Sequence, residues 1–144
     1  EALRHPASFL YVARGILGLP ALAGRTDPMR EGERGRSLLL LFHVVPFARY
    51  TIHVVELDAS TRTIRTREHG GIIKSWKHTL HAEPAGEGRC RYSDTVEIDA
   101  GVFTPIIAVV GIGIYRYRHL RWRRLVRKHL MAEGPRYAVN AEAA

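Results

Sequence analysis

Cysteine and lysine are scarce in this chain of 144 residues. The single cysteine, Cys90, excludes an internal disulfide and is typical of a reducing compartment, so we predict a cytoplasmic protein. Lysine occurs only at Lys74, Lys77 and Lys128, and the net charge of +8 therefore comes mainly from arginine. No secretory signal is visible at the N-terminus. The most apolar stretch, residues 102–115, is shorter than the roughly 20 residues that a membrane-spanning helix needs.

The length and composition fit one globular domain. Apolar residues make up 46% of the chain and charged residues 25%, which are ordinary proportions for a protein that folds around a core. We assign the domain to residues 1–132. The remainder, residues 133–144, is rich in alanine and is expected to be a disordered tail.

A short helix and a series of strands are predicted in the first hundred residues. Residues 6–19 place Phe9, Val12, Ile16 and Leu19 on one helical face, and the charged, glycine-rich segment 24–36 is typical of a loop. Five strand-like segments follow, separated by turn residues. They are residues 37–45, 49–58, 62–69, 72–83 and 89–99. Their regular spacing and short connections favour one antiparallel sheet.

One long helix, residues 104–131, ends the predicted domain. Thr104 is suited to capping it, and Pro105 fits its first turn, where no N–H donor is needed. Its first half is almost wholly apolar and its second half is dense in arginine. A lone long helix after antiparallel strands indicates an α+β fold in which a curved sheet wraps around the helix and encloses a cavity.

Alternation along the strands predicts which side chains face the helix. The inward polar groups would be Glu68, Trp76, His78, Tyr92 and Asp94, while either His53 or Glu56 could point inward from the strand 49–58. Three interpretations of these groups are open. They satisfy one another's hydrogen bonds, they orient a ligand, or a carboxylate beside an imidazole performs acid–base chemistry.

Three segments of the chain resemble the START-like, birch-allergen-like superfamily. They are residues 65–84 (RTREHGGIIKSWKHTLHAEP), 92–105 (YSDTVEIDAGVFTP) and 114–125 (IYRYRHLRWRRL). The pair Trp76 and His78 and the strand around Asp94 are the most specific parts, and the nearest subgroup is the bacterial SRPBCC proteins of the polyketide cyclase and dehydrase type. The resemblance implies a helix-grip fold. Members usually begin with a strand that this chain lacks, so we expect an upstream segment to be missing.

The same resemblance implies a cavity that holds a lipid, a polyketide or another apolar small molecule between sheet and helix. We predict that apolar and polar side chains both line this cavity. The predicted set is Ile64, Glu68, Trp76, His78, Leu80, Tyr92, Asp94, Val96, Ile98, Phe103, Ile107 and Val110. The alternative is a cyclase- or dehydratase-like enzyme with His78 and Asp94 as its acid–base pair.

A third interpretation concerns the arginine-rich helix end, residues 116–128. We predict a solvated basic face, because positive charge complements the dipole at a helix C-terminus. The weaker alternatives are contact with an anionic membrane surface or with nucleic acid, and the resemblance disfavours nucleic acid because similar helix ends occur in that superfamily. We predict no cofactor and no metal site, since the histidines lack zinc-binding spacing. Cys90 carries no signature of an activated nucleophile and is predicted to be a buried structural thiol.

Overall fold

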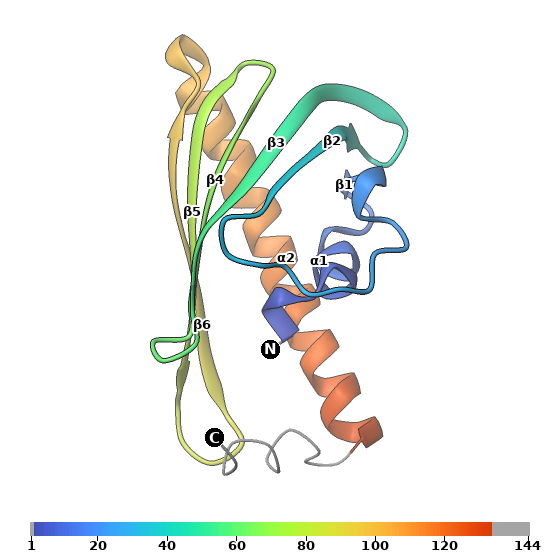
Figure 1. Cartoon of the computed structure of the whole chain (residues 1–144), viewed down its shortest axis with the longest axis vertical. Coiled ribbons are helices and arrows are strands. Elements are labelled where there is room, and N and C mark those ends of the chain that lie inside the picture. The colour runs from blue at the N-terminus through green and yellow to red at the C-terminus, as the bar shows by residue number, and fades with distance from the viewer. Residues whose placement is uncertain (1, 134–144) are drawn as a thin grey trace.

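A six-stranded antiparallel sheet curls around one long helix (Figure 1). The computed structural model describes residues 2–133, with side chains described as far as Lys128. Each strand pairs with the next in the chain. The strands are β1 (Leu17–Gly18), β2 (Arg34–Leu41), β3 (Val45–Asp58), β4 (Thr63–Gly70), β5 (Ile73–Pro84) and β6 (Cys90–Asp99). The helices are α1 (Pro6–Ala13) and α2 (Thr104–Glu133), with short 3-10 turns at Ala2–Arg4, Pro20–Leu22 and Gly101–Phe103.

The observed architecture confirms the predicted fold class. The fold is α+β and helix-grip-like, with α2 lying across the concave side of the sheet and α1 beside it (Figure 1). The helix predicted at 104–131 begins at Thr104, whose hydroxyl accepts a hydrogen bond from the Ala100 N–H at 2.9 Å and donates to the Gly101 carbonyl. Of the predicted tail 133–144, Glu133 is the last residue of α2, and the rest lies outside the described residues.

The N-terminal helix was predicted too long. It ends at Ala13 instead of residue 19, because Arg14 leaves the helical conformation and Gly15 has a φ of +94°, a value that favours glycine. The chain then turns back as β1, where Leu17 and Gly18 pair with Leu41 and Leu40 of β2.

The second prediction to fail is the strand placed at 37–45. The strand β2 begins earlier, at Arg34, and ends at Leu41, because Phe42 and His43 adopt left-handed backbone conformations that turn the chain into β3. The segment 34–36, predicted as loop, is therefore paired with β3. The strand predicted at 49–58 begins four residues earlier, at Val45, and the remaining three predicted strands are present with shifts of one residue at their ends.

The residues of β4, β5 and β6 that were predicted to face inward are shielded from solvent in the part of the sheet beside α2. Ile64, Trp76, His78 and Leu80 are buried, and Asp94 lies on the shielded face of β6. On β3 the residues that point inward are Tyr50, Ile52 and Val54, so neither His53 nor Glu56 does. A bulge beyond Val54 leaves the Glu56 carboxylate paired with exposed Arg65 at 2.6 Å. Cys90 is exposed at the start of the edge strand β6, which corrects its prediction as a buried thiol.

Two apolar clusters make up the core. One brings together the segment after β1 and the strands β2, β3 and β5, and contains Leu19, Leu39, Tyr50, Ile73 and Trp76. The other is smaller and joins α1 to the middle of α2 through Val12, Trp122 and Leu125. Within the described part of the chain, neither helix combines the length and apolar composition that crossing a bilayer requires.

Candidate functional site

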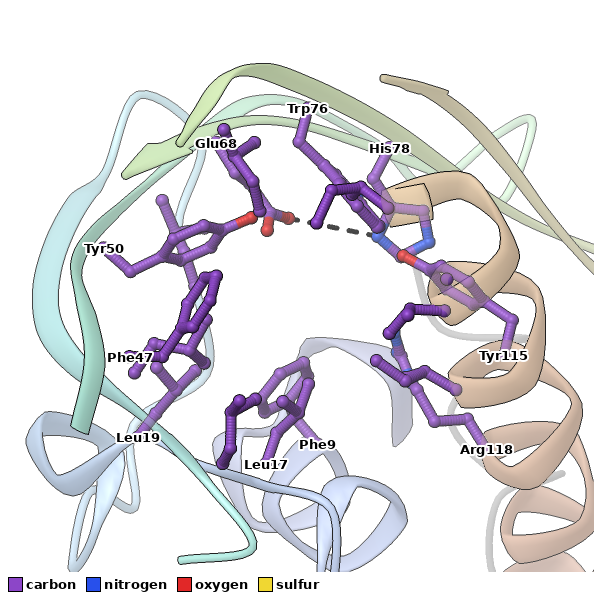
Figure 2. A pocket seen from close by; sticks show the side chains of 18 residues that line it. Phe9, Leu17, Leu19, Phe47, Tyr50, Glu68, Trp76, His78, Tyr115 and Arg118 are labelled. Carbon is purple, nitrogen blue, oxygen red and sulfur yellow. Dashed lines mark ion pairs between the residues drawn. The ribbon is translucent and has the colours of Figure 1, made fainter. Parts of the chain in front are cut away.

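An apolar cavity of about 250 Å³ lies between the concave face of the sheet and the first half of α2 (Figure 2). Figure 2 shows Phe9 and Leu17 closing it opposite Trp76 and His78. Its walls come from α1, β1–β5 and α2. The lining residues are Phe9, Leu17, Leu19, Leu39, Leu41, Phe47, Tyr50, Ile52, Glu68, Ile73, Trp76, His78, Ile107, Val110, Gly111, Ile114, Tyr115 and Arg118.

The structure divides the predicted lining among several places. Glu68, Trp76, His78, Ile107 and Val110 line the cavity. Asp94, Val96 and Ile98 line a separate groove between β6 and the opposite side of α2. Ile64, Leu80, Tyr92 and Phe103 line neither. The cavity lies toward α1 and β1–β3, whereas the prediction centred it on β4–β6.

Most of the cavity wall near the N-terminus was not predicted from the sequence. Phe9 and Leu19 belong to the segment predicted as a helix with one apolar face, for which no contact with the cavity was predicted. Tyr50 was not predicted because the two faces of the strand 49–58 are similar in composition. On α2, Arg118 was assigned to a solvated basic face. The spacing of Arg118 from Ile107 and Gly111 could have indicated that it lines the cavity, since residues at these intervals share one side of a helix.

Asp94 lies at the centre of a polar cluster beside the cavity. Its side chain is 3% exposed. One carboxylate oxygen is 2.5 Å from His78 Nε2 and accepts a hydrogen bond from the Tyr92 hydroxyl at 2.7 Å. The other oxygen is 2.7 Å from His119 Nε2. Both oxygens are therefore occupied by neighbouring side chains.

The environment favours the ionised form of Asp94. Burial alone would raise the pKa of this carboxyl, but the hydrogen bond and charge of His78, the charge of Arg118 and the hydrogen bond from Tyr92 together lower it. An ionised carboxylate only accepts hydrogen bonds, so each imidazole presents an N–H to it. Burial raises the pKa of the Tyr92 hydroxyl, which stays protonated and continues to donate.

A second carboxylate, Glu68, lies inside the cavity. It accepts a hydrogen bond from the Thr66 hydroxyl at 2.6 Å, and one of its oxygens is 4.0 Å from His78 Nδ1 (Figure 2). The imidazole of His78 is therefore flanked by a carboxylate on each ring nitrogen. Such a group can be held in one orientation and can accept or donate a proton at the cavity wall.

The arginines of α2 have two different roles. Arg118 is buried, and Arg121 lies over the Tyr11 ring while donating to the Tyr11 carbonyl. The outward-facing members are Arg116, Arg123, Arg124 and Arg127. The predicted solvated basic face therefore holds only part of this set.

Among the described residues, no cluster of three or more histidine, cysteine, aspartate or glutamate side chains is arranged to hold a metal ion. No curated protein and no solved structure matches the sequence. Residues 19–128 match the model of a domain of unknown function, DUF8410. This match covers most of the chain and nearly all of the cavity wall, and the protein belongs to the DUF8410 family.

Proposed function

We propose that this protein binds a hydrophobic small molecule in the cavity between the sheet and α2. The observation that carries the proposal is the cavity itself, whose wall is apolar apart from a few polar groups at one side. Ligand sites are commonly concave, apolar and equipped with a small number of orienting polar groups. The volume is slightly below the roughly 300–1,000 Å³ of typical ligand pockets, which favours a small ligand.

The resemblance to the START-like superfamily stays a prediction, and it supports the same proposal. Proteins of that superfamily hold lipids, polyketides or other apolar molecules between a curved sheet and a long helix. The present fold has the same elements in the same relation (Figure 1). A cytoplasmic location, expected from the single cysteine, also stays a prediction.

Calorimetric titration with octanol tests the proposal, because octanol is apolar and uncharged. The wild-type protein should bind it, and Ile107→Trp should abolish binding because the indole would fill the cavity. Val109→Trp is the matched control, since Val109 lies two residues away on α2 and is 69% exposed. Failure of the wild-type protein to bind octanol would contradict the proposal, as would equal binding by both variants.

A second candidate function is favoured by the His78–Asp94 contact. His78 lines the cavity, whereas Asp94 faces the neighbouring groove, so His78 would exchange the proton and Asp94 would orient its ring. This cyclase- or dehydratase-like activity is tested on any polyketide-type substrate that the protein turns over. His78→Ala should abolish turnover, and Asp94→Asn should lower it and shift its pH profile. Unchanged turnover in both variants would exclude the pair.

Contact with an anionic membrane or nucleic acid through the basic helix end stays a prediction. Its remaining basis is the exposed set Arg116, Arg123, Arg124 and Arg127. Such binding would weaken steeply with added salt, whereas octanol binding in the cavity would not.

A further inference from the structure

Arg118 is a buried charge in the wall of the cavity. The residue is 5% exposed, and its Nε atom has no hydrogen-bond partner. Among the described residues, no carboxylate lies within ion-pair distance of its guanidinium. Burying an ionised group without a partner is costly, because the protein interior does not replace the water that the group loses.

Aromatic rings hold the guanidinium but leave its donors free. The Cζ atom lies 4.9 Å from the centre of the Tyr115 ring and 5.4 Å from that of Phe9. Cation–π contacts of this kind stabilise the charge, yet they use none of the planar N–H groups. Figure 2 shows the Arg118 side chain reaching from α2 toward the cavity between Phe9 and Tyr115.

The nearby carboxylates are engaged with other partners. Both oxygens of Asp94 are taken by His78, Tyr92 and His119. The Glu68 carboxylate accepts a hydrogen bond from the Thr66 hydroxyl and lies 4.0 Å from His78 Nδ1. The guanidinium of Arg118 therefore keeps N–H donors that can bind an anion, in a cavity whose other polar groups are Glu68, His78 and the Tyr50 and Tyr115 hydroxyls.

We infer that the cavity binds a small apolar acid, with an aliphatic or aromatic body and one carboxylate that pairs with Arg118. This inference rests on the proposed function and narrows its ligand class. Arginine pairs with a carboxylate through two parallel hydrogen bonds, which suits a flat acid group at a fixed position. A single negative charge is favoured because the Glu68 carboxylate shares the cavity.

Calorimetry with matched acids and alcohols tests the inference at about pH 7, where the acids are ionised. The probes are hexanoic, octanoic and decanoic acids and the corresponding alcohols. In the wild-type protein we expect the best acid to bind at least about tenfold more tightly than its alcohol. In Arg118→Met this preference should disappear, while binding of the alcohol is retained or improved.

Control variants separate the role of this charge from general effects. Arg123→Met removes an exposed arginine from the same helix and should keep the preference for acids. Thermal unfolding of Arg118→Met shows whether it folds, and Arg118→Lys, which retains the charge, should recover part of the preference. If acids and alcohols bind the wild-type protein equally, the inference is overturned and the proposed function stands. If no probe of either series binds, both are overturned.

Discussion

Asp94 is the residue at which burial and charge oppose each other most directly. Its folded-state pKa is lowered, because the hydrogen bonds and charges around it outweigh the effect of burial. The unfolded chain therefore binds more protons in acid. The stabilisation is complete above the unfolded pKa of about 3.9 and is lost as the pH falls through the lower folded value.

This balance predicts the effect of Asp94→Asn on stability. The free energy of unfolding at neutral pH should fall by about 1.5–3 kcal/mol, because hydrogen bonds to a charged acceptor are lost or weakened. The variant should also lose part of the decline in stability that the wild-type protein shows below about pH 4. Urea unfolding at a series of pH values measures both effects. A parallel acid limb in the two proteins would refute the role given to Asp94.

Gly70 is a residue at which the backbone leaves no room for a side chain. A Cβ atom there would lie 2.9 Å from the Tyr50 Cα and would also collide with the Arg49 carbonyl. Gly70→Ala should lower the free energy of unfolding by about 1–3 kcal/mol or more, because the main chain of β3 must move. Gly35→Ala in β2 meets nothing within 4 Å and should be neutral or stabilising. Denaturant unfolding of both variants measures the difference. Equal losses in the free energy of unfolding would contradict the expectation.

At the scale of elements, α1 is fastened to α2 by side chains of α2. The Arg121 Nε and Nη2 atoms donate to the Tyr11 carbonyl at 3.2 and 2.8 Å, and the Tyr117 hydroxyl donates to the Arg14 carbonyl at 2.8 Å. These carbonyls lie at the end of α1, where carbonyls run short of helical N–H donors. The Tyr11 carbonyl also accepts a long backbone hydrogen bond, 3.4 Å, from the Arg14 N–H. The contacts thus complete the C-terminus of one helix with the surface of the other.

The hydrogen bonds between α2 and α1 predict that two arginines of α2 contribute differently to stability. Arg121→Met should lower the free energy of unfolding by about 1–3 kcal/mol, because the hydrogen bonds to Tyr11 and the contact with its ring are lost. Arg123→Met should change it by less than about 0.5 kcal/mol, since that side chain is exposed. Chemical denaturation of both variants provides the comparison. Similar losses would show that Arg121 contributes no more than a surface charge.

Elements with strong periodicity were predictable, and those made by tertiary contact were not. The helix from Thr104 and the strands around Trp76 and Asp94 have side-chain patterns long enough to identify. The strand β1 has only two residues, Leu17 and Gly18, and forms because β2 lies beside it. No local pattern carries that information.

The candidate site follows the same division. Alternation correctly brought His78 and Asp94 together, because both lie on the inner face of neighbouring strands at adjoining register positions. Alternation does not say where α2 crosses the sheet. The helix separates Asp94 from the cavity and turns Arg118 into it, and both results depend on the docking of α1 and α2.

At the scale of the whole molecule, the helices α1 and α2, which lie near opposite ends of the sequence, close the cavity together. Phe9 of α1 and Arg118 of α2 are in contact in its wall, with the Arg118 Cζ 5.4 Å from the centre of the Phe9 ring. The cluster of Val12, Trp122 and Leu125 holds their helices together. Val12 is 0% exposed and does not line the cavity. Its substitution therefore acts on the position of the wall without removing a ligand contact.

Val12→Ala and Val54→Ala separate stability from the closure of the cavity. Val54 is 3% exposed in β3 and also lies outside the cavity wall, so each variant should lose about 1–3 kcal/mol of stability. Only Val12→Ala loosens α1, and apparent affinity falls in proportion to the fraction of molecules that have the closed wall. We expect octanol and octanoate to bind Val12→Ala a few-fold more weakly and Val54→Ala as well as wild type. Calorimetry below the unfolding temperature of both variants measures this. Equally weakened binding by both variants would mean that affinity follows overall stability and does not depend on the position of α1.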